Sequence, residues 1–115
     1  MDFDNVAWEH PLPGCRFKSI VKGNRQIRLL ELTSEFRELD WCIKGHAGIV
    51  LEGDLEIDFR GRIEQFPQGS ALLIPAGDDG AHKARAVSER ALLFLVEDTW
   101  PRPSRKQFSL SPPAR

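Results

Sequence analysis

Long hydrophobic runs are absent from this sequence of 115 residues. The longest apolar stretches, such as residues 91–96, fall far short of the roughly 18 residues that a membrane span requires. Cysteine is also scarce, with Cys15 and Cys42 as the only two. The first residues are acidic and carry no apolar signal core, so we expect a cytoplasmic protein with reduced thiols and no contact with a membrane.

An excess of charge of one sign is missing as well. The formal net charge is −1 at pH 7, so no global field favours nucleic acid or an anionic surface as a partner. The sequence contains no serine nucleophile elbow, no phosphate-binding glycine loop, no paired zinc-finger cysteines and no dinucleotide fingerprint. A length of 115 residues is typical of a single domain that folds around its own core.

Short apolar segments alternate with turn residues through the middle of the chain. Leu55, Ile57 and Phe59 alternate with acidic residues, which is the pattern of a strand with one buried face. The same reasoning predicts strands over residues 25–33, 46–52, 55–59, 62–66, 71–74, 81–87 and 91–97. No stretch has a helical period of useful length. The sequence therefore predicts an all-β antiparallel sandwich or barrel.

The two ends differ from this middle region. Four of the eight prolines fall in the last fifteen residues, so we interpret residues 98–115 as a proline-rich tail. Its basic residues are interpreted as a solvated surface rather than a nucleic-acid contact. Residues 1–24 are assigned to an N-terminal arm and a first strand, and residues 25–97 to the barrel.

Two segments carry a family resemblance. The first runs from His46 through six residues to Gly53, and the second from Gly69 to Pro75 and Gly77. Together they resemble the paired motifs of the cupin superfamily, across roughly residues 25–97. The resemblance implies a small single-domain cupin, a jelly-roll barrel also described as a double-stranded β-helix. Many such barrels hold a metal in their mouth.

The resemblance also implies a set of metal ligands. The first motif of the family has two histidines, a glutamate and a glycine, and Asp40, Cys42 and His46 occupy the three ligand positions before Gly53. In the second motif the loop is lengthened, so that His82 supplies the fourth group. Carboxylate, thiolate and imidazole all bind divalent transition metals, here Zn, Ni, Fe or Cu.

A metal-free polar pocket remains open as the other interpretation. Cys42 is of a type that is often buried as a small hydrophobic residue, and Asp40 is of a type that often caps turns. We assign Arg28 and Trp41 to the pocket. Arg28 would clamp a carboxylate if it faced the lumen, and would otherwise be a surface residue. Strand alternation places Trp41 on the opposite face from the ligands.

Three functions are compatible with this reading. The first is a cupin that binds a small molecule and a divalent metal, with no reaction assigned. The second is a metal-dependent oxygenase or isomerase acting on a small organic acid or sugar. The third is a non-catalytic structural or regulatory dimer. Residues 91–96 are apolar on both faces of their strand, so the outer face needs cover from a partner or from the terminal arms. The resemblance to small cupins, which commonly pair, implies a homodimer.

Overall fold

The computed structural model describes residues 2–98, and this part of the chain is built from antiparallel β-strands and two single-turn 3-10 helices. The tail assigned to residues 98–115 therefore lies outside the described residues, except for Asp98. The elements are, in order, η1 (Phe3–Asn5), β1 (Glu9–Leu12), β2 (Cys15–Lys22), β3 (Arg25–Thr33), β4 (His46–Glu52), β5 (Leu55–Phe59), β6 (Arg62–Phe66), β7 (Ala71–Ile74), η2 (Asp78–Gly80), β8 (Lys83–Ala86) and β9 (Arg90–Asp98).

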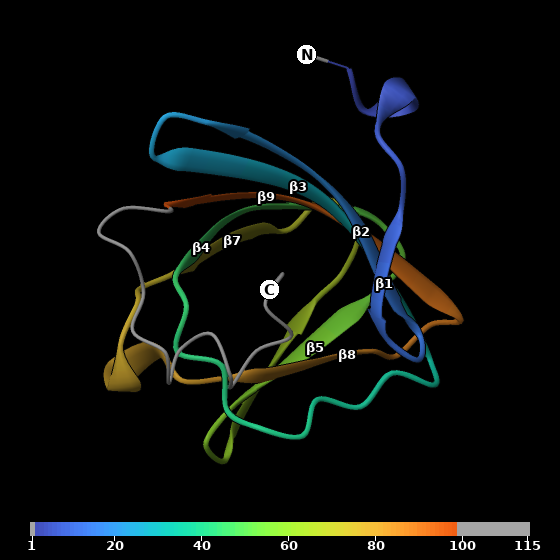
Figure 1. Cartoon of the computed structure of the whole chain (residues 1–115). Coiled ribbons are helices and arrows are strands. Elements are labelled where there is room, and N and C mark those ends of the chain that lie inside the picture. Colours follow the sequence, from blue (N-terminus) through green and yellow to red (C-terminus); the bar gives the residue numbers. More distant parts are fainter. Residues whose placement is uncertain (1, 99–115) are drawn as a thin grey trace.

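The strands form two sheets. The larger has six strands in the order β1-β2-β3-β9-β4-β7, and the smaller has three in the order β6-β5-β8. The larger sheet curves over the smaller one, so that their inner faces look toward each other (Figure 1). The prediction of an all-β jelly-roll fold is confirmed. Within residues 2–98 no helix has the length and apolar character needed to cross a membrane.

A single hydrophobic core fills the space between the sheets. Leu55 and Ile57 of β5 are buried in it, and Phe59 packs against its edge, as their alternation predicted. Burial of each such side chain stabilises the fold by about 1.5–3 kcal/mol. Phe17 and Val50 add buried surface from the larger sheet.

Strand β9 lies in the middle of the larger sheet, between β3 and β4. Its side chains alternate strictly: Leu93, Leu95 and Glu97 are buried, whereas Phe94 and Val96 are only partly buried on the outer face. Both faces of the strand therefore carry apolar residues. Glu97 is the exception on the inner face, at the end of the strand where the core gives way to polar groups.

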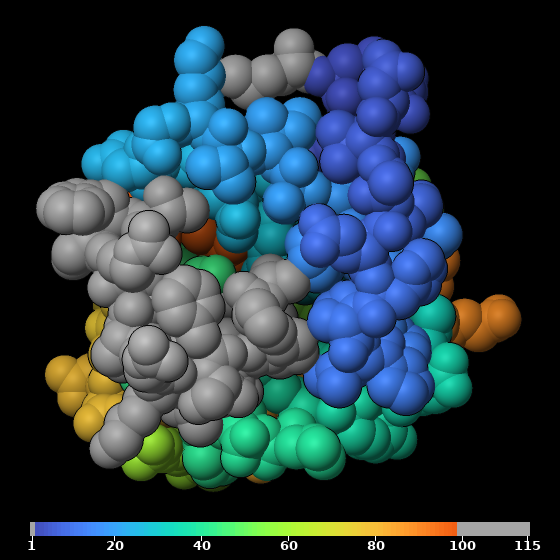
Figure 2. Space-filling view, viewed as in Figure 1, coloured from blue at the N-terminus to red at the C-terminus, as the bar shows by residue number. Residues whose placement is uncertain are grey.

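The N-terminal segment contributes more to the sheet than an arm and one strand. Strands β1 and β2 form a hairpin, and β2 pairs with β3 along its whole length from Cys15↔Leu32 to Lys22↔Arg25. In the space-filling view, this hairpin forms one side of the visible face. The blue-green segment before β4 lies along the lower edge of that face (Figure 2). Residues 9–22 are thus part of the framework that positions the inner polar groups.

Candidate metal centre

Three inner side chains meet at one end of the larger sheet because of its strand register. Gln26 lies opposite Glu97 where β3 pairs with β9. Ala47 lies opposite Val96 where β4 pairs with β9. One step further along these antiparallel strands, His46 lies beside Glu97. Gln26, Glu97 and His46 therefore form a row across three neighbouring strands.

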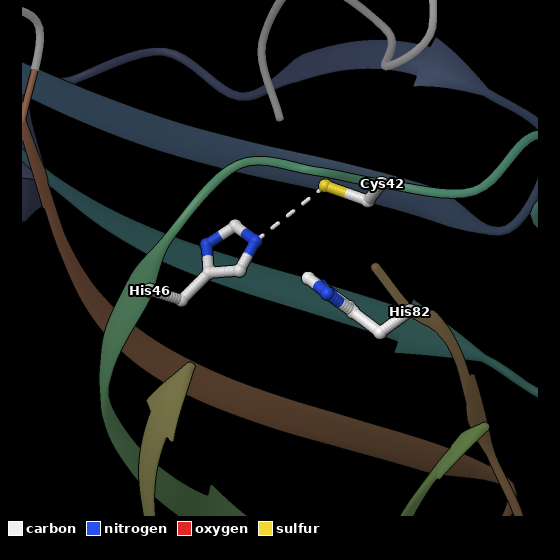
Figure 3. Close-up of side chains that lie close together, drawn as sticks. All are labelled: Cys42, His46 and His82. Atoms are coloured by element: carbon white, nitrogen blue, oxygen red, sulfur yellow. Dashed lines mark hydrogen bonds between the residues drawn. The ribbon is translucent and has the colours of Figure 1, made fainter. Parts of the chain in front are cut away.

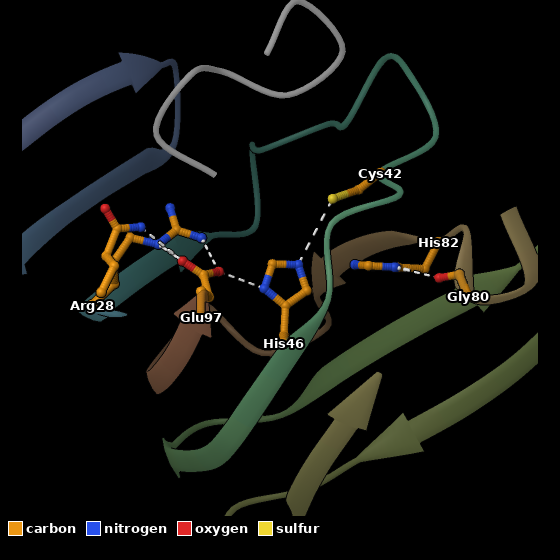
Figure 4. A network of polar contacts seen from close by, with 7 residues as sticks. Arg28, Cys42, His46, Gly80, His82 and Glu97 are labelled. Atoms are coloured by element: carbon orange, nitrogen blue, oxygen red, sulfur yellow. Dashed lines mark hydrogen bonds and ion pairs between the residues drawn. The ribbon is translucent and has the colours of Figure 1, made fainter. Parts of the chain in front are cut away.

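Glu97 is the centre of this row. Arg28 donates two hydrogen bonds to its carboxylate, from Nε to Oε1 and from Nη2 to Oε2, both 2.8 Å long. Gln26 donates a third to Oε1 at 2.9 Å, and Nδ1 of His46 lies 2.5 Å from Oε2. Burial alone would raise the pKa of Glu97, but the hydrogen bond with His46 and the charge of Arg28 outweigh it and hold the pKa well below its ordinary value. Glu97 is therefore an ionised, fully buried carboxylate (Figure 4).

The carboxylate fixes the orientation of the His46 ring. An ionised carboxylate can only accept a hydrogen bond, so Nδ1 of His46 carries the proton and donates to Glu97. The lone pair then lies on Nε2, which faces Sγ of Cys42 at 3.7 Å. A carboxylate behind an imidazole is the usual support of a metal-binding histidine, since it fixes the tautomer and makes the ligand nitrogen more basic.

Backbone pairing brings His82 to the same place. Cys42 and His82 form an isolated antiparallel bridge, with N–H to carbonyl distances of 2.8 and 2.9 Å in the two directions. The Nδ1 atom of His82 donates to the carbonyl of Gly80, at 2.8 Å. Gly80 packs so closely on Pro75 that any Cβ at this position would collide with the proline carbonyl. A glycine is therefore required for the turn that presents this carbonyl to His82.

The result is a compact group of three potential ligands. Cys42, His46 and His82 are all buried, and their ligand atoms lie within 4.8 Å of one another. The two imidazole rings meet edge to face, with centroids 5.1 Å apart, and Figure 3 shows Cys42 and His46 on one segment and His82 on another, with the three side chains converging. A tetrahedral metal with ligands at about 2.0–2.3 Å needs donor atoms about 3.3–3.8 Å apart. Sγ of Cys42 and Nε2 of His46, 3.7 Å apart, meet this requirement, and a thiol with two imidazoles is a donor set of the type that transition metals bind.

The remaining predicted site residues lie in different places. Asp40 is exposed in a bend and is not brought to the group. Trp41 is half-buried, and the cations of Lys83 and Arg60 lie over its ring at 4.7 and 5.6 Å from the centroid. Arg28 does face the interior and clamps a carboxylate, but that carboxylate is the protein's own Glu97.

Glu97 is the functional residue that the sequence reasoning missed. A signal for it exists in the sequence, because the alternation of Leu93 and Leu95 places Glu97 on the same inner face of strand β9. An acidic residue on an inner face needs a partner, and Arg28 is an inner-face cation on the neighbouring strand. The pairing itself depends on strand order, which the sequence does not state.

A separate cavity of about 360 Å³ lies at the β1–β2 turn. It is lined by residues of the hairpin and of β3, including His10, Cys15, Arg16 and Thr33. None of Cys42, His46 and His82 lines it, so the cavity is distinct from the three-ligand group. The candidate site is the three-ligand group, because three potential ligand atoms lie within 4.8 Å of one another there and hydrogen bonds orient both imidazoles.

Comparisons with known proteins give the fold its class. No protein-family model and no curated protein matches the sequence. Among solved structures, KdgF from Halomonas sp. is similar with a TM-score of 0.69 and 18% identity, covering 91% of this chain and 94% of that one. A sugar phosphate isomerase of the cupin superfamily from Silicibacter pomeroyi gives a TM-score of 0.72 at 15% identity, over 88% and 76% of the two chains. A cupin-2 domain protein from Shewanella frigidimarina gives 0.57 at 26% identity, over 71% and 78%.

The fold is that of a small cupin domain. The similar structures carry the same jelly-roll architecture along most of this chain. At this level of identity they show the fold and leave the reaction unassigned.

Proposed function

We propose that this cupin domain binds one divalent transition metal through Cys42, His46 and His82. The observation that carries the proposal is the convergence of a thiol and two imidazoles, all buried, with ligand atoms within 4.8 Å. Both imidazoles have a hydrogen-bond acceptor at Nδ1, which leaves Nε2 as the coordinating atom. We propose zinc as the best match, since a thiolate and two imidazoles form one of its common donor sets; Ni, Fe and Cu are the other metals that we consider.

Three protein ligands leave a fourth tetrahedral position for a small molecule. A metal in this place would polarise an oxygen atom bound at the open position. Two acceptors of the protein orient the imidazole ligands. Glu97 keeps the proton of His46 on Nδ1, and the carbonyl of Gly80 does the same for His82. We therefore propose a small-molecule-binding domain whose ligand approaches the metal between the two sheets.

Metal uptake tests this proposal directly. Purified protein is loaded with zinc, desalted and analysed for metal content, with circular dichroism as the check on folding. We expect one zinc per chain in the wild type and none in the double variant His46→Ala/His82→Ala. His10→Ala is the matched control, because His10 is exposed and away from the group. Equal zinc content in the double variant and the control would overturn the proposal.

An enzyme is the alternative function. The open coordination position favours it, and one structurally similar protein is described as a sugar phosphate isomerase. The corresponding hypothesis is a metal-dependent oxygenase or isomerase acting on a small organic acid or sugar. Turnover that depends on the metal, and that is lost with Cys42→Ser, would favour the enzyme over a binding domain.

We also propose a homodimer that forms through the outer face of the larger sheet. Leu73 of β7 is 85% exposed, and Ile49 on the neighbouring strand β4 is 38% exposed. The strand register places Leu73 of β7 opposite Ala47 of β4, and Ala47 opposite Val96 of β9, so this outer face is apolar across three strands. Within residues 2–98, Phe3 of η1 packs edge-on against Phe94 on this face. A second copy would bury the rest, as expected for an exposed apolar patch.

Solution mass tests the dimer. We expect light scattering to give the mass of two chains for the wild type at micromolar concentration, and of one chain for Leu73→Asp. Ile63→Asp is the matched control, since Ile63 is an exposed apolar residue of the smaller sheet. A monomeric wild type would contradict the proposal. A cytoplasmic location is also part of our proposal, supported by two buried cysteine thiols that would be stable under reducing conditions.

A further inference from the structure

The guanidinium of Arg28 has more hydrogen-bonding capacity than its surroundings use. Its Nε and Nη2 atoms donate to Glu97. The remaining nitrogen, Nη1, is buried and has no hydrogen-bond partner within the described part of the chain. Arg28 itself is 0% exposed. A buried donor without an acceptor destabilises the fold, so native proteins rarely retain one unless something else satisfies it.

The position of this nitrogen relates it to the metal centre. In Figure 4 the guanidinium nitrogen without a dashed line points away from Glu97, toward the side on which Cys42 lies. Arg28 and His46 are held on the same carboxylate oxygen of Glu97. Arg28, which carries the spare donor, is thus connected to the three-ligand group through the carboxylate of Glu97 and the ring of His46.

The charges of the site favour an anion. Arg28 and Glu97 neutralise each other as a buried ion pair. A divalent metal on one thiolate and two neutral imidazoles would leave one net positive charge in a region shielded from water. A ligand with a single negative charge would balance it. A neutral ligand would not.

We propose that the small molecule bound here is a short carboxylate that bridges Arg28 and the metal. Its carboxylate accepts a hydrogen bond from Nη1 of Arg28, and a second oxygen, such as a hydroxyl, occupies the open position on the metal. This inference rests on the proposed metal site and adds the ligand class to it. Arg28 is held in place by its two hydrogen bonds to Glu97, a carboxylate that Gln26 also contacts. The ring of Phe17 packs against the guanidinium, with its centroid 5.3 Å from the guanidinium carbon. The anion subsite is thus preformed.

Cobalt-substituted protein gives separate readings of the metal and the ligand. Cobalt(II) bound by Cys42 and two histidines produces a thiolate-to-metal band in the near ultraviolet and d–d bands in the visible, which report the metal before any ligand is added. Glycolate is then titrated as the probe, with its uncharged analogue glycolamide as the matched control. We expect glycolate to change the cobalt spectrum and to bind about ten- to a hundredfold more tightly than glycolamide, because only the acid brings a negative charge to pair with Arg28 and to balance the charge of the metal.

Arg28→Lys tests the role of the guanidinium. Lysine keeps a cation beside Glu97 and removes Nη1, so cobalt uptake should persist while glycolate binding weakens about ten- to a hundredfold. Thermal unfolding of the cobalt-loaded variant verifies that it is folded. If cobalt is bound but glycolate and glycolamide bind equally, or neither binds, or Arg28→Lys changes nothing, the carboxylate inference is overturned and the metal site stands. If wild-type protein takes up no cobalt, the metal site and the bridge both fail.

Discussion

Two buried carboxylates lie on opposite faces of the larger sheet, and each contacts two basic side chains, but the exposure of those side chains differs. Glu97 on the inner face contacts Arg28 and His46, whose side chains are 1% and 7% exposed. Glu31 on the outer face contacts Arg16 and Arg90, at 2.6 and 2.5 Å, and those side chains are 37% and 41% exposed. Water can reach the side chains that contact Glu31 but not those that contact Glu97. The outer cluster therefore joins strands, whereas the inner one fixes the geometry of a site.

The same substitution at both carboxylates is expected to give the largest difference in stability between the two faces. Glu97→Gln leaves the buried cation of Arg28 without its counter-charge, so we expect a loss of about 3–5 kcal/mol in the free energy of unfolding. Glu31→Gln releases arginines that water can reach, so we expect a loss of about 1 kcal/mol or less. Urea denaturation measures both values. Equal losses in the free energy of unfolding would show that the exposure of the partner side chains does not distinguish the two clusters.

Two neighbouring leucines of β7 allow the inner and outer faces of the larger sheet to be compared without a change of charge. Leu72 is 4% exposed on the inner face, and Leu73 is 85% exposed on the outer face. We expect Leu72→Ala to cost about 2–5 kcal/mol, because it removes buried apolar surface and leaves a cavity. Leu73→Ala should change the stability of the single chain by no more than about 0.5 kcal/mol. Chemical denaturation at low protein concentration compares them, and a large loss for Leu73→Ala alone would reverse the assignment of faces.

The outer carboxylate should give a smaller effect that depends on pH. The hydrogen bond from Arg16 lowers the pKa of Glu31, with burial opposing it and Arg90 adding to it. A lowered pKa in the folded state means that the ionised carboxylate stabilises the fold above the ordinary value of 4.5, and that this contribution is lost as the pH falls through the lowered pKa. The difference in stability between wild type and Glu31→Gln should thus be constant at neutral pH and shrink in acid. A difference that is unchanged down to about pH 3 would contradict the assigned cause.

Local patterns were sufficient to predict most of the fold. The predicted strands 25–33, 46–52, 55–59, 62–66 and 71–74 have the bounds of β3 to β7, because each is delimited by turn residues and alternates at a period of two. The hairpin of β1 and β2 was underestimated, although Cys15 and Phe17 alternate with basic residues and are buried. Its proline-marked start obscured a regular strand.

The site could be predicted only in part, for two physical reasons. Cys42, His46 and His82 were selected by motif position, and the structure brings them together. Asp40 occupies a third ligand position of the same motif, but it is exposed in a bend, and irregular backbone between it and His46 leaves it outside the group. Glu97 lies far along the chain from both of its charged partners, so only the strand order reveals that it supports His46.

The central claim is that Glu97 supports a metal ligand, whereas Glu31 supports only the sheet. The zinc affinity of Glu97→Gln and Glu31→Gln, measured by competition with a chelator under conditions where both variants are folded, tests it most directly. Loss of the carboxylate behind a metal-binding histidine typically weakens affinity about 10- to 100-fold. We predict this loss for Glu97→Gln and wild-type affinity for Glu31→Gln. Equal zinc affinity in the two variants would contradict the account.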